Sequence, residues 1–172
     1  MIAARLGILV TGAAVTLALA GGGGAVAVRP CTAGQLSGTF SVIRGSAAAG
    51  SISYALRLTN RSRLTCFVYG RPGLRLLGRT GRPLPTKVVL ARPRPTAVRV
   101  ILNPTRRAQA TARFSPDVPG PGEPVSGRQC EPTAHKVRVT PPSGGGTLVA
   151  PILPPTPVCE HGTVFLSTLS RA

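Results

Sequence analysis

The chain has 172 residues, of which 21 are Lys or Arg and only four are Asp or Glu, so its formal net charge is +17. Aromatic residues make up 3% of the sequence and Trp is absent, which argues against a platform that stacks the bases of single-stranded nucleic acid. The hydrophobic content of 42% is enough for a folded core and argues against a wholly disordered chain.

The charge is distributed unevenly along the sequence. Residues 1–116 contain 17 bases and no acid, whereas residues 117–172 contain four of each and are neutral. A surface field of one sign attracts polyanions and steers them in from solution. The charge therefore constrains the partners of the protein and says nothing about its fold. The four acids are Asp117, Glu123, Glu131 and Glu160.

The N-terminus has the pattern of an export signal. A short positive start is followed by an uncharged apolar run over 6–20, four glycines and a small-residue site that ends at Ala27. This pattern predicts a cleavable signal peptide over 1–27, cut after Ala27. The uncharged stretch 6–28 is also long enough to span a membrane, so an uncleaved N-terminal anchor stays open. In both cases we expect residues 28–172 to be secreted or to lie in the cell envelope.

Short segments of alternating polar and apolar residues follow, separated by turns rich in Gly, Pro and Asn. The segments 115–127 and 153–157 are predicted to be irregular connections because prolines are frequent in them. No helical periodicity occurs after the leader. The predicted strands are 38–44, 52–58, 64–68, 74–77, 87–90, 97–102, 109–114, 135–140, 147–152 and 163–169.

This spacing predicts an all-β fold. Short strands every 8–12 residues or so are typical of an immunoglobulin-like antiparallel β-sandwich, here of about eight strands in one domain over 28–172. The alternation in 52–58 places Tyr54 and its apolar neighbours on one face and Arg57 on the other. Arg75 likewise points away from the core. Arg99 interrupts an otherwise apolar strand, so that strand needs an edge position.

The cysteines predict two disulfides, because an even number in an exported chain forms a covalent framework. Three pairings are possible, and we favour Cys31–Cys66 and Cys130–Cys159. On the loop-entropy model each bond contributes about 3–4 kcal/mol to stability. A zinc ribbon or a thioredoxin-type site is not expected, because no C-x-x-C motif is present.

The order of these landmarks resembles the exported actinobacterial family catalogued as domain of unknown function 4232. The resemblance covers about residues 31–169. It implies an exported or lipid-anchored β-sandwich and no known activity. Many members look like lipoproteins, but here Val28-Arg29-Pro30 precedes the first cysteine in place of small apolar residues. The matching residues are Cys31, Gly50-Ser51, Leu58-Thr59-Asn60, Thr65-Cys66, Tyr69-Gly70-Arg71-Pro72-Gly73, Cys130, Val139-Thr140-Pro141-Pro142 and Cys159.

No motif of catalysis is present. The sequence lacks a G-x-S-x-G elbow and a phosphate-binding G-x-x-x-x-G-K-[ST] loop. His161 lies near Cys159 and Glu160, but with His135 distant in sequence and Cys159 expected to be oxidised, no metal site is predicted. We therefore expect a protein that is not an enzyme and carries no cofactor. Asn60-Arg61-Ser62 matches a glycosylation sequon and is interpreted as a turn.

The arginines carry the functional hypothesis. The plain alternative is a solvated surface that reflects base composition. The functional interpretation is a basic sheet face that docks an anionic cell-wall polymer, an acidic lipid surface or an acidic protein, since guanidinium groups suit phosphate and carboxylate. Nucleic acid is not an expected natural partner of an exported chain. A loop-based enzyme such as a hydrolase, or a structural scaffold, stays open. The residues of the predicted face are Arg57, Arg61, Arg63, Arg71 and Arg75.

Overall fold

The computed structural model describes residues 27–93, 96–125, 129–142 and 144–172. The predicted signal peptide, apart from Ala27, lies outside the described residues. Within the described ranges, no helix has the length and apolar character needed to cross a membrane.

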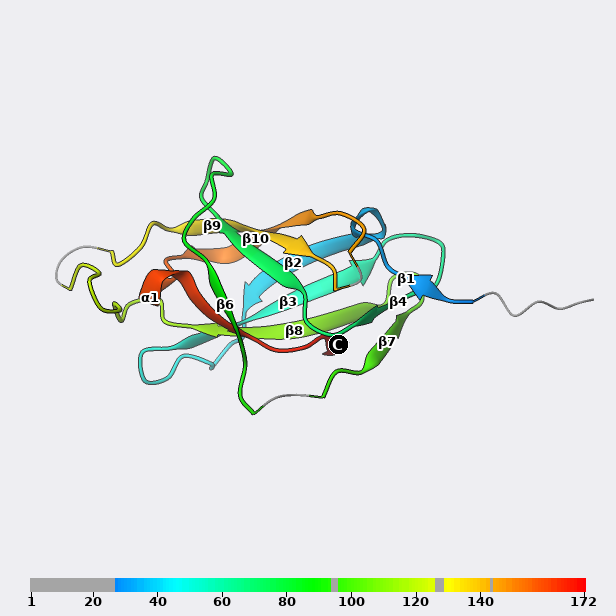
Figure 1. The fold of residues 1–172 in the computed structure, drawn as a ribbon, viewed down its shortest axis with the longest axis horizontal. Helices are drawn as coiled ribbons and strands as arrows, with labels where there is room; N and C mark the ends of the chain where they lie inside the picture. Colours follow the sequence, from blue (N-terminus) through cyan, green and yellow to red (C-terminus); the bar gives the residue numbers. More distant parts are fainter. Residues whose placement is uncertain (1–26, 94–95, 126–128, 143) are drawn as a thin grey trace, which may run out of the picture.

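The described residues form twelve strands and two single helical turns (Figure 1). The all-β prediction is confirmed, and the strand count exceeds the predicted eight partly because β1 and β12 are two-residue pieces. The turns are η1 (Ala33–Gln35) and α1 (Cys159–Gly162). The strands are β1 (Arg29–Pro30), β2 (Leu36–Val42), β3 (Ile52–Asn60), β4 (Cys66–Tyr69), β5 (Gly73–Leu77), β6 (Lys87–Leu90), β7 (Arg99–Leu102), β8 (Arg107–Phe114), β9 (Ala134–Thr140), β10 (Leu148–Thr156), β11 (Thr163–Leu166) and β12 (Ser170–Arg171).

Two sheets account for these strands. The larger has the order β5-β9-β10-β2-β3-β8-β11-β6, with β12 paired to β8, and the smaller has the order β1-β4-β7. Most neighbours are antiparallel, as predicted, but β1 with β4, β10 with β2 and β11 with β6 are parallel. Each parallel pair joins strands distant in sequence, where alternation does not indicate strand direction.

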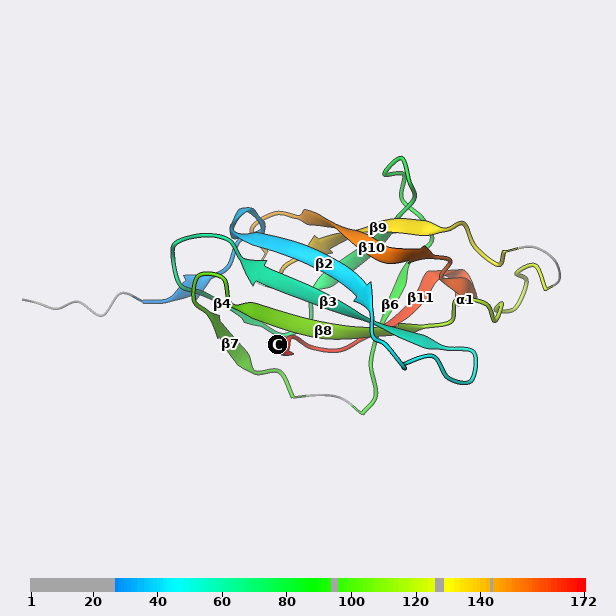
Figure 2. The same cartoon turned by 180° about the vertical axis from the view of Figure 1, so that it is seen from behind.

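The larger sheet curls until its two ends meet. The N–H of Leu84 donates to the carbonyl of Leu76 at 3.0 Å, and the N–H of Leu76 donates to Thr86 Oγ1 at 3.0 Å. These bonds tie the end of β5 to the segment that leads into β6. Figures 1 and 2 show β9 and β10 along one side of the molecule and β3 and β8 along the other. The result is a β-sandwich around one hydrophobic core.

Strand β3 supplies the centre of that core. Its inward-facing Tyr54, Leu56 and Leu58 are at most 1% exposed, which confirms the predicted alternation. The ring of Tyr54 lies 5.2 Å from those of Phe40 and Phe114, measured between centroids. Such aromatic pairs add to the free energy gained from burial alone.

The end of β3 is fixed by Asn60, whose side chain is fully buried. Its amide donates to the carbonyls of Leu64 and Leu102, both at 2.8 Å, and its Oδ1 accepts the N–H of Ser62. The sequon is therefore a turn, as predicted. Because the turn extends through Leu64, that residue is 68% exposed and precedes β4, so the prediction that it belongs to a strand is wrong.

The proline-rich stretch 153–157 is not the irregular connection that was predicted, because β10 continues to Thr156. Pairing with β9 covers Leu148 to Pro151 and resumes only at Thr156, while Ile152 and Leu153 pair with β2. Proline has no N–H to donate to a ladder. The break in register leaves the prolines of this stretch outside the ladder while the backbone stays extended.

Both favoured disulfides are present, Cys31–Cys66 and Cys130–Cys159. The first joins the segment after β1 to β4, and the second joins the loop before β9 to α1. Disulfides persist in oxidising compartments, so these two indicate an extracytoplasmic environment. The prediction for Arg99 is also confirmed, because β7 is an edge strand of the smaller sheet and Arg99 is exposed, 3.7 Å above the ring of Phe67.

Candidate functional site

The outward face of β3 carries Arg57, as the alternation predicts. Arg57 is opposite Thr39 of β2 and Gln109 of β8, at the centre of the larger sheet. Its Nη1 donates to Ser41 Oγ at 3.1 Å, a bond to an uncharged partner. Within the described residues this is the one hydrogen bond of the Arg57 side chain, and the side chain forms no ion pair there, so most of its N–H donors are available to a partner.

Arg57 belongs to a group of four arginines that we call the basic cluster: Arg57, Arg106, Arg107 and Arg171. Arg57, Arg106 and Arg107 line one surface hollow of about 450 Å³. Arg106 and Arg107 also line a second, of about 410 Å³, together with Arg171. Strand pairing explains the gathering, because Thr59 is opposite Arg107 and β12 pairs with the same end of β8.

Among the described residues, no Asp or Glu side chain lines either hollow of the basic cluster. The ion pairs within the described part of the chain involve His161, Glu123 and Glu131 and no arginine. Arg106, Arg107 and Arg171 are exposed. Four like charges close together repel one another, so an anion bound among them would be stabilised.

The structure does not bring the five predicted arginines onto one surface. Arg61 and Arg63 lie in the turn after β3, at the end of the sheet where the Asn60 N–H donates to the Arg106 carbonyl. Arg71 lies between β4 and β5. Arg75 is on β5, which is separated from β3 by three strands.

Arg75 instead has a basic neighbour of its own. It is directly opposite Arg138 of β9, and both side chains are exposed. This pair was not expected from the sequence, because strand order decides which residues face each other. Arg106, Arg107 and Arg171 were missed for the same reason. The sequence offered one local indication of an outward-facing position: Arg107 alternates together with Gln109 and Thr111, so the three side chains share the polar face of β8.

Three of the four acids gather at the other end of β8, in what we call the acid corner: Glu123, Glu131, Glu160 and His161, beside the Cys130–Cys159 disulfide. The Cys159 N–H donates to the carbonyl of Ser115, which follows β8, and so attaches α1 to that end of the strand. The distances from His161 Nδ1 to the carboxylates of Glu123 and Glu131 are 3.6 and 3.9 Å.

Glu123 is the buried centre of this corner, with its side chain 3% exposed. Its carboxylate accepts the backbone N–H groups of Gly120, Glu160 and His161. Burial raises the pKa of Glu123, but these three hydrogen bonds and the nearby His161 lower it by a larger amount. The pKa of Glu123 is therefore below its ordinary value. Burial and the charge of Glu123 raise the pKa of Glu131.

The converging N–H groups come from an unusual backbone. Glu160 and His161 have φ of 57° and 55°, and Gly162 follows with φ of 73°, so α1 is a left-handed turn. Left-handed residues other than Gly cost about 1–2 kcal/mol each. The disulfide at Cys159 and the carboxylate of Glu123 hold the turn in place.

The acid corner brings together potential metal ligands. One ligand atom from each of Glu123, Glu131 and His161 falls within 4.8 Å of the others. However, the carboxylate of Glu123 already accepts three backbone hydrogen bonds. We therefore interpret the corner as a structural anchor for the left-handed turn. Asp117 and His135 are not part of the group.

A search of curated proteins found no significant match. A family model, in contrast, matches nearly the whole of the sandwich, including all four cysteines and Asn60. The chain belongs to the family described as Domain of unknown function (DUF4232), whose model matches residues 31–169.

Proposed function

We propose that this protein is a non-enzymatic docking module of the cell envelope, or a secreted one, that binds an anionic polymer through the basic cluster. The observation that carries the proposal is the gathering of Arg57, Arg106, Arg107 and Arg171 around two adjoining hollows that no Asp or Glu side chain of the described residues lines. A repeating phosphate or carboxylate would supply the missing countercharges.

The surroundings of the cluster favour a polymer over a lipid surface. The outward positions beside Arg57 carry hydroxyl and amide groups from Thr39, Ser41 and Gln109. Hydroxyls and amides can hydrogen-bond to a sugar or polyol backbone, whereas binding to a membrane surface gains strength from buried apolar area, which these positions do not offer. Export by a signal peptide cut after Ala27 is part of the proposal, and the disulfides support it.

The test measures retention of the purified protein on immobilised poly(glycerol phosphate) at low and high salt. We expect binding at about 20 mM NaCl that weakens strongly at about 200 mM, because added salt shortens the distance over which the arginines attract an anion. The double variant R57Q/R107Q is expected to lose roughly tenfold in affinity. The matched control is R75Q/R138Q, which removes the same charge from the opposed pair on β5 and β9.

Equal losses in the two double variants would overturn the proposal, because net charge and not the basic cluster would then decide binding. Anionic vesicles and polyglutamate serve as comparison ligands. If either is retained more tightly than poly(glycerol phosphate), the partner is a lipid surface or an acidic protein, and the assignment to a polymer is wrong. N-terminal sequencing of the exported protein tests the cut after Ala27.

A further inference from the structure

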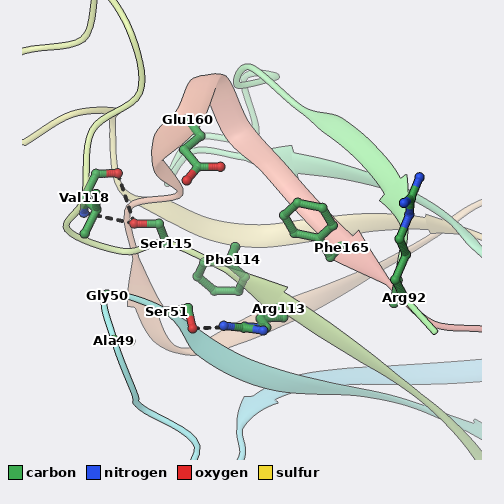
Figure 3. Close-up of a pocket in the computed structure, with 11 residues that line it drawn as sticks. Ala49, Gly50, Ser51, Arg92, Arg113, Phe114, Ser115, Val118, Glu160 and Phe165 are labelled. Atoms are coloured by element: carbon green, nitrogen blue, oxygen red, sulfur yellow. Dashed lines mark hydrogen bonds between the residues drawn. The ribbon is translucent and has the colours of Figure 1, made fainter.

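A third hollow, distinct from the two of the basic cluster, lies where β8 ends and β11 passes beside it. We call it the end hollow; its volume is about 440 Å³. Figure 3 shows that its labelled side chains come from separate segments: Arg113 and Phe114 from β8, Phe165 from β11 and Glu160 from α1. The hollow thus combines charged and apolar groups contributed by several parts of the chain.

Arg113 is already held in position at this site. Its Nε donates to Ser51 Oγ at 3.0 Å, and within the described residues this is the single hydrogen bond of the side chain (Figure 3). The two terminal nitrogens are left as a fork whose spacing matches a carboxylate. A fixed guanidinium loses less conformational entropy on binding than a free one.

The same hollow exposes apolar surface. Phe165 is 38% exposed and Val118 is 47% exposed, and both line the hollow. Val118 is fixed by Ser115, whose hydroxyl accepts the Val118 N–H at 2.9 Å and donates to its carbonyl at 3.0 Å. Gly50 closes the wall, because a Cβ on it would meet the side chain of Val118. A hydrophobic wall next to an oriented guanidinium is typical of sites for amphipathic small molecules.

The charges of the end hollow add to one positive charge. Arg92 and Arg113 each contribute +1 and Glu160 contributes −1, and neither arginine forms an ion pair with Glu160 in the described structure. This balance matches a ligand with one negative charge. A second negative charge would be repelled by Glu160.

We propose that the end hollow binds a small organic monoanion, a carboxylate attached to a planar apolar group. The carboxylate is held by the terminal nitrogens of Arg113, and the apolar group lies against Phe165 and Val118. This site is independent of polymer binding at the basic cluster, because none of its residues lines the hollows of that cluster. Either proposal can therefore fail without the other.

The test is an NMR titration of the ¹⁵N-labelled protein with benzoate at constant ionic strength. Benzyl alcohol and phenyl phosphate serve as neutral and doubly charged analogues. We expect saturable shifts of the amides of Arg113, Val118 and Phe165 with an affinity on the order of millimolar, as suits a small fragment. Benzoate is expected to bind more tightly than both analogues.

Three variants decide where the probe binds. R113Q is expected to weaken benzoate binding roughly tenfold, the worth of a charge-assisted pair. E160Q is expected to tighten it about twofold, because a repulsive charge is removed. R138Q, a matched control on the exposed face of β9, is expected to leave it unchanged. The opposite signs for Arg113 and Glu160 cannot arise from loss of folding.

The proposal is overturned if R113Q and wild type bind benzoate equally, if E160Q weakens binding, or if benzyl alcohol binds as well as benzoate. Shifts confined to residues outside the end hollow also overturn it. Thermal melting curves check that each variant is folded. F165S provides an independent variant, since loss of the apolar wall should weaken benzoate binding while the arginines remain.

Discussion

The acid corner and the basic cluster lie at opposite ends of β8, a strand whose eight residues span about 25 Å. In the acid corner, the central carboxylate is buried and binds groups of the chain itself. Glu123 is buried and accepts three backbone hydrogen bonds, and His161 lies between two carboxylates. In the basic cluster, three of the four side chains are exposed and Arg57 is hydrogen-bonded to a serine.

The difference separates charges that maintain the fold from charges that are free to bind. A buried carboxylate whose hydrogen bonds are removed leaves its donors unsatisfied, and this costs stability. An exposed arginine without a partner in the chain costs little when removed. We therefore expect substitutions in the acid corner to alter the free energy of unfolding, and substitutions in the basic cluster to alter binding.

The largest effect is expected from G162A. Gly162 has φ of 73°, and a Cβ there would overlap the backbone carbonyl of Pro85. Because the obstacle is backbone, it cannot move aside easily, and we expect the free energy of unfolding to fall by about 3–5 kcal/mol. Denaturant unfolding followed by circular dichroism measures the loss.

The control for this substitution is G122A. Gly122 has a similar φ of 84°, but a Cβ added there would meet no atom within 4 Å. Only the backbone preference is lost at this position, at a cost of about 1 kcal/mol. Equal losses for the two variants would show that the tight packing of α1 against Pro85 does not matter to stability.

The next largest effect is expected from E123Q, with a loss of about 2–3 kcal/mol at pH 7, because an amide is a weaker acceptor than a carboxylate. The loss should depend on pH. The pKa of Glu123 is below its ordinary value of 4.5 in the folded protein, so its ionisation stabilises the fold above that pH. As the pH falls through the lowered pKa, this stabilisation disappears, and wild type and E123Q should converge.

The control at this position is E131Q. The pKa of Glu131 is raised in the folded protein, so its ionisation opposes folding at neutral pH and the neutral variant should be as stable as wild type or slightly more so. Unfolding curves between about pH 7 and pH 3 test both variants. A constant gap between wild type and E123Q over this range would contradict the role given to the ionised carboxylate.

The smallest effect on stability is expected from R57Q/R107Q. Neither arginine forms an ion pair within the described residues, and the one hydrogen bond lost is that from Arg57 to Ser41. We expect the free energy of unfolding to change by less than about 0.5 kcal/mol. Thermal unfolding measures it. A loss as large as that of E123Q would mean that the cluster is part of the framework and would remove the contrast between the two regions.

Local pattern was sufficient to predict much of the sandwich. Period-two alternation identified β3 with Tyr54 inward and Arg57 outward, and the same rule oriented Arg75. Cysteine count and order predicted both disulfides. Strand alternation depends on residues adjacent in the sequence, and four cysteines allow three pairings. Both features could therefore be predicted from the sequence.

What the sequence did not reveal depends on strands that are distant in the chain. Arg57 joins Arg107 and not Arg75, because β3 pairs with β8 while three strands separate it from β5. The left-handed turn at Glu160 was not predicted, because two of its three left-handed residues, Glu160 and His161, are not glycines. It is imposed by Glu123, 37 residues earlier, through a hydrogen bond that no local pattern encodes.

The buried side chain of Asn60 has a practical consequence for producing the protein. In a eukaryotic secretory host, a glycan attached to the nascent sequon would occupy the amide nitrogen that the folded chain needs for its bonds to Leu64 and Leu102. A glycan cannot be accommodated at a fully buried position. Glycosylated molecules would therefore be retained as misfolded material, and a bacterial periplasm is the better expression compartment.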